Sequence, residues 1–488
     1  MTDSPIVTTA SGPVRGFWRD PGTIDASAAF LGIPFAKPPV GRLRFEAPVP
    51  PDPWAEPLDA TEYGATPLRI TGVDNLIPEP AVPGKSTLNV NVFSPSTAGS
   101  LPVLVWIHGG GYTEGSPASP WYDGARFNRD GVVTVSISYR LGFDGFGHIA
   151  GAPANRGVRD WIAALEWVQQ NIAFFGGDPA RVTIGGQSAG GGAVLTLLGM
   201  PRVQHLFHQA LSISGALADV PLETARGRAE RLAELGGVTP DVRGFRELSE
   251  RRIRQLQPKA ATPRKGIGMV LDLLTGGLPW GPMVDGELIE RPTVDSLASG
   301  IGADKPLLLG ATDDEFTMVA ERERGKVRMI PGALLLRPFL RDRRVRRAYL
   351  AANTAQRAKG SAALVGRFVS DHVFRVVVPR VAEARRRADA ATWAYRFSWV
   401  SPTKGWACHC LDVPFWFDGL DREKVANLAG PNPPQGLADE MHTAAKSFVV
   451  DGEPGWPAWS NRPGAARVFG GDGADVAEDA YDSVLALV

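Results

Sequence analysis

Residues 186–190 read Gly186-Gln187-Ser188-Ala189-Gly190, a G-x-S-x-G pentapeptide in which small residues flank a serine. The preceding residues 181–185 are rich in β-branched side chains and predict a buried strand, whereas residues 191–198 predict a packed helix. A strand that turns into a helix at this motif is a nucleophile elbow, whose small residues let the backbone hold the serine in a strained conformation. The pattern therefore predicts that Ser188 stands at the end of a sheet, in front of a helix N-terminus.

The pentapeptide alone is a weak indication of catalysis, because the chain contains 56 glycines among 488 residues and some matches arise by chance. A Gly-rich turn without chemistry is the competing interpretation. A serine hydroxyl becomes a nucleophile only beside a base, a group that orients the base, and donors for the oxyanion. Those groups have to be sought in the rest of the chain.

Apolar runs typical of buried strands recur along the chain with helical patterns between them. This alternation indicates a mainly parallel sheet with helices on both faces, so the predicted fold class is α/β. No repeat or linker divides the chain, and residues 1–488 are expected to form one domain. Pro and Gly concentrate in residues 31–84 and 402–436, which predicts long loops around one end of the sheet. The strand-like runs are residues 102–107, 132–137, 182–184 and 305–309, and a helical pattern covers residues 160–171.

The composition is that of an ordinary globular protein, with 44% hydrophobic and 21% charged residues. Lys+Arg and Asp+Glu both number 52, so the net charge indicates neither nucleic acid nor a membrane as a partner. Two Arg-rich stretches, 337–347 and 380–387, are interpreted as solvated helix faces rather than docking patches, because Asp342 and Glu383 interrupt them.

The sequence favours a cytoplasmic protein. Its N-terminal residues lack the basic and apolar regions of a secretory signal, and no apolar run approaches the roughly 18–20 residues that span a bilayer. The two cysteines, Cys408 and Cys410, are separated by a single residue, so a bridge between them would be badly strained. A structural zinc site needs about four ligands, and these cysteines with His409 are too few. No metal or organic cofactor is expected.

A glycine loop predicts the donors for the oxyanion. His108-Gly109-Gly110-Gly111 directly follows the apolar run 102–107 and matches the HGGG-type loop whose backbone N–H groups hold the oxyanion in lipases and esterases. Glycines let these amides approach a substrate where side chains would clash. With the N–H of Ala189, those of Gly110 and Gly111 would complete the oxyanion hole. A tight strand-to-loop turn is the alternative.

The base is sought among seven histidines. The expected fold has the chain order serine, acid, histidine, and only His372, His409 and His442 lie far enough after Ser188. His372 and His442 belong to helix-like stretches, where a surface or packing role is expected. His409 lies in a loop of small residues and is the predicted base.

The acid should follow a late strand and precede the histidine. Residues 307–310 predict such a strand, and the turn after it contains Asp313, Asp314 and Glu315. Composition does not choose among these carboxylates, and all of them are compatible with a solvated turn.

Over nearly its whole length the chain resembles the type B carboxylesterases, the α/β-hydrolase family that includes bacterial esterases, mammalian carboxylesterases and cholinesterases. This resemblance implies an α/β-hydrolase fold in which long loops form an active-site gorge. Besides the elbow and the glycine loop, it rests on the blocks Phe30-Leu31-Gly32-Ile33-Pro34-Phe35-Ala36, Phe175-Gly176-Gly177-Asp178-Pro179 and Gly281-Pro282-Met283-Val284-Asp285-Gly286.

The resemblance implies Glu315 as the acid, because Gly310 and Glu315 preserve the ends of the family's G-x-N-x-x-E pattern. It also supports His409, which lies in a loop ahead of a segment close to the family's E-x-P-F. Some residues depart from the family's pattern: Gln187 replaces a Glu before the serine, Thr312 replaces the Asn of the acid turn, and Cys410 replaces the Gly after the histidine.

Together these features predict a serine hydrolase that cleaves carboxylic esters of small molecules through an acyl-enzyme on Ser188, with His409 and Glu315 completing the triad. A carbamate or amide hydrolase with the same triad is one alternative, and a non-catalytic binding protein of the same fold is another. Whether the chain is a monomer or a homo-oligomer is left open. Candidates for the substrate pocket, for each of which a place in the core is the competing interpretation, are Tyr112, Trp280, Phe316 and Phe415.

Overall fold

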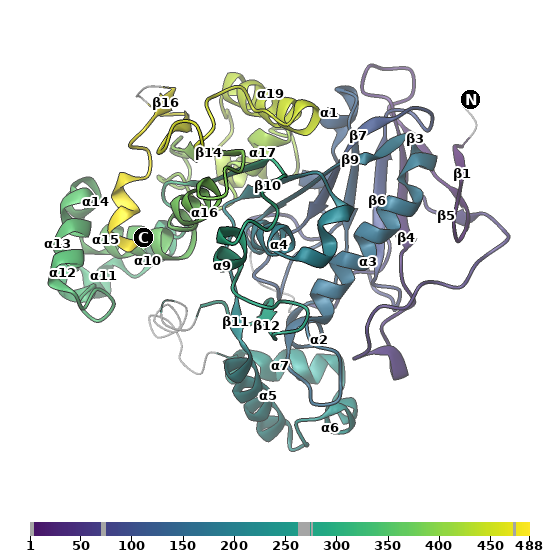
Figure 1. Ribbon diagram of the computed structural model, residues 1–488, viewed down its shortest axis with the longest axis horizontal. Helices are drawn as coiled ribbons and strands as arrows, with labels where there is room; N and C mark the ends of the chain where they lie inside the picture. The colour runs from purple at the N-terminus through teal and green to yellow at the C-terminus, as the bar shows by residue number, and fades with distance from the viewer. Residues whose placement is uncertain (1–3, 70–74, 262–273, 275–276, 472–474) are drawn as a thin grey trace.

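An eleven-stranded sheet runs through the molecule, with helices on both of its faces (Figure 1). The structure is a computed structural model that describes residues 4–69, 75–261, 274, 277–471 and 475–488. From edge to edge the strands follow the order β16-β15-β14-β13-β10-β9-β7-β8-β6-β4-β3. The α/β class predicted from the sequence is confirmed.

The strands from β8 to β15 in that order are parallel, and antiparallel strands flank them at both edges. The predicted apolar runs are β7 (Leu101–Ile107), β8 (Val133–Ile137), β9 (Gly177–Gln187) and β13 (Leu307–Thr312). The remaining strands of the sheet are β3 (Phe17–Arg19), β4 (Ser27–Pro34), β6 (Asn89–Ser94), β10 (Gln209–Ile213), β14 (Thr392–Phe397), β15 (Ala466–Phe469) and β16 (Val476–Ala477).

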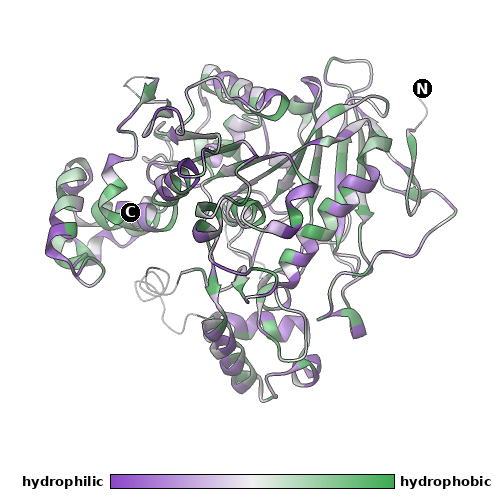
Figure 2. Ribbon diagram, in the orientation of Figure 1, coloured by the Kyte–Doolittle hydropathy of each residue, from purple (hydrophilic) through white to green (hydrophobic). Residues whose placement is uncertain are grey.

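Each face of the sheet builds its own core, because successive side chains of a strand point to opposite faces. On β7, Val103 and Val105 join one core, whereas Leu104 and Trp106 join the other. The strands are accordingly hydrophobic along their length, and the outer helices carry hydrophilic stripes (Figure 2). The first core includes α3 (Arg156–Asn171), α4 (Ala189–Leu198) and α16 (Val377–Arg386), and the second includes α1 (Ala125–Arg129), α17 (Val413–Trp416) and α19 (Gln435–Asp451).

Two groups of helices project from this sheet-centred body, one at the bottom and one at the left of Figure 1. Among the helices of the described residues, none combines the length and the apolar composition needed to cross a membrane. The lower group is α5 (Leu222–Gly236), α6 (Val242–Glu247) and α7 (Glu250–Ala261). The left group is α10 (Thr317–Arg322), α11 (Arg324–Val327), α12 (Gly332–Leu335), α13 (Arg343–Ala352), α14 (Thr354–Lys359) and α15 (Ser361–Ser370).

Candidate active site

Ser188 occupies the turn between a strand and a helix, since β9 ends directly before it and α4 begins directly after it. Its φ of 60° and ψ of −123° are strained for any residue with a side chain. Its N–H donates to the Ile213 carbonyl at 2.9 Å, and its own carbonyl accepts from the N–H groups of Gly192 and Ala216 at 2.9 and 3.1 Å. These bonds hold the strained conformation that the pentapeptide predicts, and that prediction is confirmed.

The glycines around Ser188 are required because backbones pass too close for a side chain. A Cβ on Gly190 would lie 2.0 Å from the carbonyl oxygen of Ile107 at the end of β7. A Cβ on Gly186 would lie 2.5 Å from the backbone of Gly190. The motif therefore packs the elbow against the neighbouring strand as well as turning the chain.

His409 and Glu315 form a hydrogen-bonded line with Ser188. The His409 Nε2 lies 2.9 Å from the Ser188 Oγ, and the His409 Nδ1 lies 2.5 Å from the Glu315 Oε2. The second oxygen of Glu315 accepts from the backbone N–H of Thr312 at 2.9 Å. The carbonyl of Glu315 also accepts from the His409 N–H at 2.9 Å, so backbone and side chain both fix the pair. All of the predicted triad residues come together.

Thr312 holds the Glu315 carboxylate through its backbone N–H and not through its side chain. Within the described residues, the Thr312 hydroxyl is buried without a hydrogen-bond partner. Its replacement of the family's Asn therefore leaves Glu315 anchored by a main-chain donor that any non-proline residue supplies.

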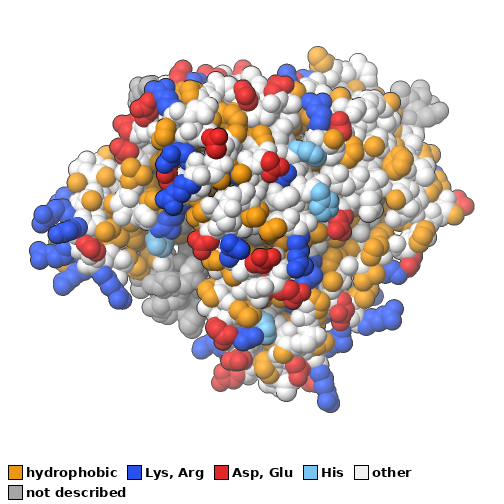
Figure 3. Space-filling model, viewed as in Figure 1, with side chains coloured by type: hydrophobic (Ala, Val, Ile, Leu, Met, Phe, Trp, Pro, Cys, Tyr) orange, Lys and Arg blue, Asp and Glu red, His pale blue; other side chains and the backbone are white. Residues whose placement is uncertain are grey.

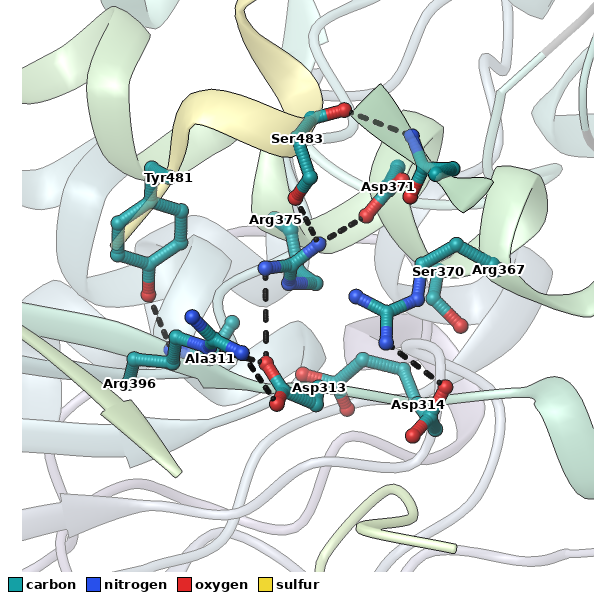
Figure 4. Close-up of polar contacts among 12 residues, drawn as sticks. Ala311, Asp313, Asp314, Arg367, Ser370, Asp371, Arg375, Arg396, Tyr481 and Ser483 are labelled. Carbon is teal, nitrogen blue, oxygen red and sulfur yellow. Dashed lines mark hydrogen bonds and ion pairs between the residues drawn. The ribbon is translucent and has the colours of Figure 1, made fainter. Parts of the chain in front are cut away.

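The carboxylates beside Glu315 are engaged by arginines (Figure 4). Asp313 accepts from Arg396 at 2.6 and 2.9 Å and lies 3.5 Å from Arg375. Asp314 accepts from Arg367 at 3.1 Å. Burial raises the pKa of Asp313, but the Arg396 and Arg375 guanidinium groups lower it by more, so its pKa lies below the ordinary value. Composition could not separate the carboxylates of this turn, but their partners do.

The arginine cluster ties the acid turn to distant parts of the chain. Arg375 and Asp371 lie on a π-helical turn, η5 (Asp371–Arg375), and form a buried ion pair at 2.5 Å. Arg375 also donates to the Ser483 hydroxyl at 3.1 Å, and the Tyr481 hydroxyl accepts from the N–H of Ala311 at 3.2 Å (Figure 4). The C-terminal segment thus supports the end of β13, three residues before Glu315.

The glycine loop lies directly against the elbow. A Cβ on Gly109 would lie 3.1 Å from the Ser188 Cβ. Gly110 and Gly111 have φ values of 107° and 59°, and no acceptor for either N–H is found among the described residues. Ala189 is the first residue of α4, so its N–H has no acceptor within the helix. The loop and the helix therefore bring uncommitted donors to the neighbourhood of Ser188.

The other late histidines make contacts elsewhere. His442 lies on α19, with its Nε2 3.0 Å from the Asp130 carboxylate and its Nδ1 3.0 Å from the Trp416 carbonyl oxygen. His372 lies on η5, where its ring stacks on Phe368 with centroids 5.7 Å apart. Both have the packing roles that their helical context predicts.

Aromatic rings enclose the His409 imidazole. Phe316 stacks on it with centroids 5.1 Å apart, and Phe374 lies 4.7 Å away. Phe316 is one of the predicted pocket residues. Sequence reasoning missed Phe374, because its helix-like stretch carries no motif and the π-helical turn that aims it is invisible in the sequence.

The other predicted pocket residues are buried in the cores. Tyr112 is fully buried and packs against Phe146, with ring centroids 5.0 Å apart. Trp280 is packed against Phe143 at 5.7 Å. Phe415 is fully buried between Phe397 and Trp399. Of the four candidates, Phe316 is the one with a ring directly on His409.

Gln187, which the sequence marked as unusual, reaches the same imidazole. Its Nε2 lies 3.3 Å from the His409 Nε2, the atom that also faces the Ser188 hydroxyl. An amide N–H donates to the lone pair of a neutral imidazole and so favours the uncharged ring. Burial lowers the pKa of His409, but Cys410 and Glu315 raise it by more, so its pKa lies above the ordinary value of 6.5.

Gln187→Glu is expected to move the acid limb of kcat/KM upward by about one pH unit or more. A carboxylate at this position stabilises the imidazolium, which cannot accept a proton, so activity is lost at a higher pH as the pH falls. The measurement is the pH profile of p-nitrophenyl acetate hydrolysis. Gln170→Glu adds the same charge at an exposed position on α3 and should leave the profile unchanged. An unshifted limb in Gln187→Glu would contradict the contact.

Comparison with known proteins agrees with the geometry. The model of the Carboxylesterase family matches residues 3–465. The chain is 33% identical to the fumonisin B1 esterase of Sphingopyxis macrogoltabida, covering 96% of this chain and 87% of that protein. It is 32% identical to the para-nitrobenzyl esterase of Bacillus subtilis, covering 93% and 92%. The structure of a Geobacillus stearothermophilus carboxylesterase superposes with a TM-score of 0.82 at 32% identity, covering 95% and 96%. The chain belongs to the carboxylesterase family and is an ester hydrolase with the α/β-hydrolase fold.

Proposed function

We propose that this carboxylesterase hydrolyses small esters through an acyl-enzyme on Ser188. The Ser188 Oγ attacks the ester carbonyl while the His409 Nε2, 2.9 Å away, takes its proton. Glu315 accepts from the Nδ1–H, which fixes the tautomer and stabilises the imidazolium. His409 then protonates the departing alcohol, and a water molecule releases the acid by the same proton transfers in reverse. The continuous line from Ser188 through His409 to Glu315 is the observation that carries this proposal.

The oxyanion of the tetrahedral intermediate is assigned to the N–H groups of Gly110, Gly111 and Ala189. Support comes from the uncommitted loop donors and from the position of Ala189 at the start of α4, where the helix dipole favours negative charge. In comparable sites the loss of one donor costs about 2.7–4 kcal/mol of transition-state stabilisation. Backbone N–H groups thus stabilise the oxyanion without any charged side chain.

Esters are the proposed substrates in preference to carbamates and amides. Phe316 and Phe374 cover the imidazole with apolar surface, so the group next to the scissile bond meets hydrocarbon. An ester also releases an alcohol, whose oxygen is a much less basic and therefore better leaving group than the nitrogen of an amide, and His409 supplies its one proton. The two esterases named above, at 33% and 32% identity, support the same class.

The test compares kcat/KM for an ester, a carbamate and an anilide that share one acyl or aryl group. The ester is expected to react at least about a thousand-fold faster than the anilide, because the anilide is the more stable acyl group and its nitrogen is the poorer leaving group. Labelling with a sulfonyl fluoride should modify Ser188 alone and abolish all the activities together. A faster carbamate or anilide, or a label on another residue, would contradict the proposal.

A further inference from the structure

The helices α11 to α14, residues 324–360, carry a large positive charge, although the chain as a whole is neutral. This segment, here called the basic lobe, contains eleven Lys or Arg residues and one acidic residue, Asp342, a net charge of +10. In the whole chain Lys+Arg and Asp+Glu both number 52. Figure 3 shows the Lys and Arg side chains gathered at the left end of the molecule, where Figure 1 places α12 and α13. A charge segregated in this way attracts anions whatever the net charge.

Most of these cations form no ion pair with the residues that the structure describes. Arg324 and Lys326 pair with Glu321 and Glu323 on the preceding turn. Asp342 accepts hydrogen bonds from the backbone N–H groups of Arg344 and Val345 and caps α13. Its negative charge therefore stabilises the N-terminus of that helix. Within the described residues, seven exposed arginines of the basic lobe make no ion pair: Arg328, Arg337, Arg341, Arg343, Arg344, Arg347 and Arg357.

The same lobe exposes large apolar side chains. Met329 is 84% exposed, Leu334 55% and Ile330 41%, which places all three among the most exposed hydrophobic residues described. On α13 a shallow depression of about 350 Å³ is lined by arginines and small residues. Its lining residues are Arg343, Arg344, Arg347, Ala348 and Ala351. Cationic and apolar groups side by side are the surface that a phospholipid headgroup region complements.

We propose that the basic lobe docks on an anionic phospholipid surface. The arginines would bind lipid phosphates, and Met329, Ile330 and Leu334 would enter the boundary between headgroups and acyl chains. A nucleic acid would satisfy the arginines equally well, but it would leave these apolar side chains in water. The exposed apolar side chains therefore favour lipid over a polyanion.

This inference departs from the expectation, drawn from the neutral net charge, that the chain has no membrane partner. The sequence-based interpretation of the Arg-rich stretches as solvated helix faces rests on the interruptions by Asp342 and Glu383. In the structure Asp342 caps a helix, whereas Glu383 pairs with Arg386 on α16, outside the basic lobe. Neither carboxylate forms an ion pair with the seven exposed arginines named above.

The basic lobe is joined to the proposed active site at both ends. α10 begins directly after Phe316, and α15 leads into the turn that carries Phe374, both of which contact His409. The Lys359 Nζ also lies 4.6 Å from the ring of Trp406, in the loop that precedes His409. Docking through this lobe would hold the site near the lipid in which apolar esters dissolve.

The test is cosedimentation of the full chain with vesicles of phosphatidylcholine, with and without phosphatidylglycerol. We expect binding to the anionic vesicles that falls steeply with salt, and little binding to phosphatidylcholine alone. The triple variant Arg343→Gln, Arg344→Gln, Arg347→Gln should bind roughly a hundred-fold more weakly, from the usual contribution of each cation at a membrane. The matched variant Arg243→Gln, Arg251→Gln, Arg252→Gln removes the same charge from exposed positions near α6 and α7 and should bind normally.

Met329→Ser combined with Leu334→Ser should also weaken vesicle binding, and this effect should persist at high salt. Equal binding by the two triple variants, or no preference for anionic vesicles, would overturn the proposal. Tighter binding to a DNA duplex, with no effect of the two serine substitutions, would assign a polyanion instead. A dimer that only the Arg343 triple variant disrupts would assign a second copy of the chain.

Unchanged p-nitrophenyl acetate hydrolysis in every surface variant would show that it is folded. The vesicle assay can also be run with Ser188→Ala, so its outcome does not depend on the proposed chemistry.

Discussion

Replacing Ser188 with alanine is expected to lower kcat for p-nitrophenyl acetate by about five to six orders of magnitude. The reason is that the proposed acyl-enzyme cannot form without the Oγ that lies 2.9 Å from the His409 Nε2. The residual rate over water would come from the oxyanion donors and substrate binding. Steady-state kinetics, with burst-phase measurements on the unaltered enzyme, would detect the loss of both turnover and the acyl intermediate.

Ser138→Ala is the matched control for this prediction. Ser138 is a fully buried serine, and within the described residues its hydroxyl has no hydrogen-bond partner, so its removal should leave activity and stability nearly unchanged. Wild-type turnover in Ser188→Ala would refute the assignment of the nucleophile. Equal losses in both variants would mean that a buried serine hydroxyl matters for folding rather than for chemistry.

Glu315→Gln is expected to lower kcat by about 10⁴-fold with little change in KM. The amide keeps the size of the side chain but removes the charge that stabilises the imidazolium, and it can hold the wrong tautomer of His409 by donating to Nδ1. Because the interaction acts only once the proton has moved, the loss should appear in kcat and kcat/KM alike. The 2.5 Å contact between the Glu315 Oε2 and the His409 Nδ1 is the structural basis.

Asp313→Asn, two residues away, separates chemistry from stability. Removing the Asp313 charge leaves Arg396 without its carboxylate and Arg375 with Asp371 alone, and should destabilise the fold by about 3–5 kcal/mol. The pKa of Asp313 is lowered in the folded state, so its contribution is complete above the unfolded pKa of about 3.9 and is lost as the pH falls below it. The stability difference measured by denaturant unfolding should therefore shrink under strong acid. If Glu315→Gln lost stability and Asp313→Asn lost only kcat, the two roles would be reversed.

Local sequence patterns predicted much of the fold and of the candidate site. Apolar runs predicted β7, β8, β9 and β13, because burial on both faces leaves a continuous apolar signature within each strand. The elbow at Ser188 was equally local, since its strain and its glycines lie within one pentapeptide. The order of serine, acid and histidine then reduced the histidines to a few candidates.

Some features of the site had no local signature. Asp313, Asp314 and Glu315 look alike in the chain, and only their partners Arg396, Arg367 and His409 distinguish them. The contact of Phe374 with His409 depends on a π-helical turn, and three of the predicted pocket aromatics proved to be buried in the cores.

The strained serine turn, the glycine loop and the alternation of strands and helices can all be predicted from the amino-acid sequence, because each depends on residues within a few positions of one another. The tertiary contacts select which acid meets His409 and bring Gln187 to the same imidazole, and within the described residues they leave most arginines of the basic lobe without an ion pair. Ser188 and Glu315 lie 221 and 94 residues from His409, so their contacts depend on how the sheet orders its strands. Contacts over such separations are selected by the packing of the whole chain, and no short stretch of sequence encodes them.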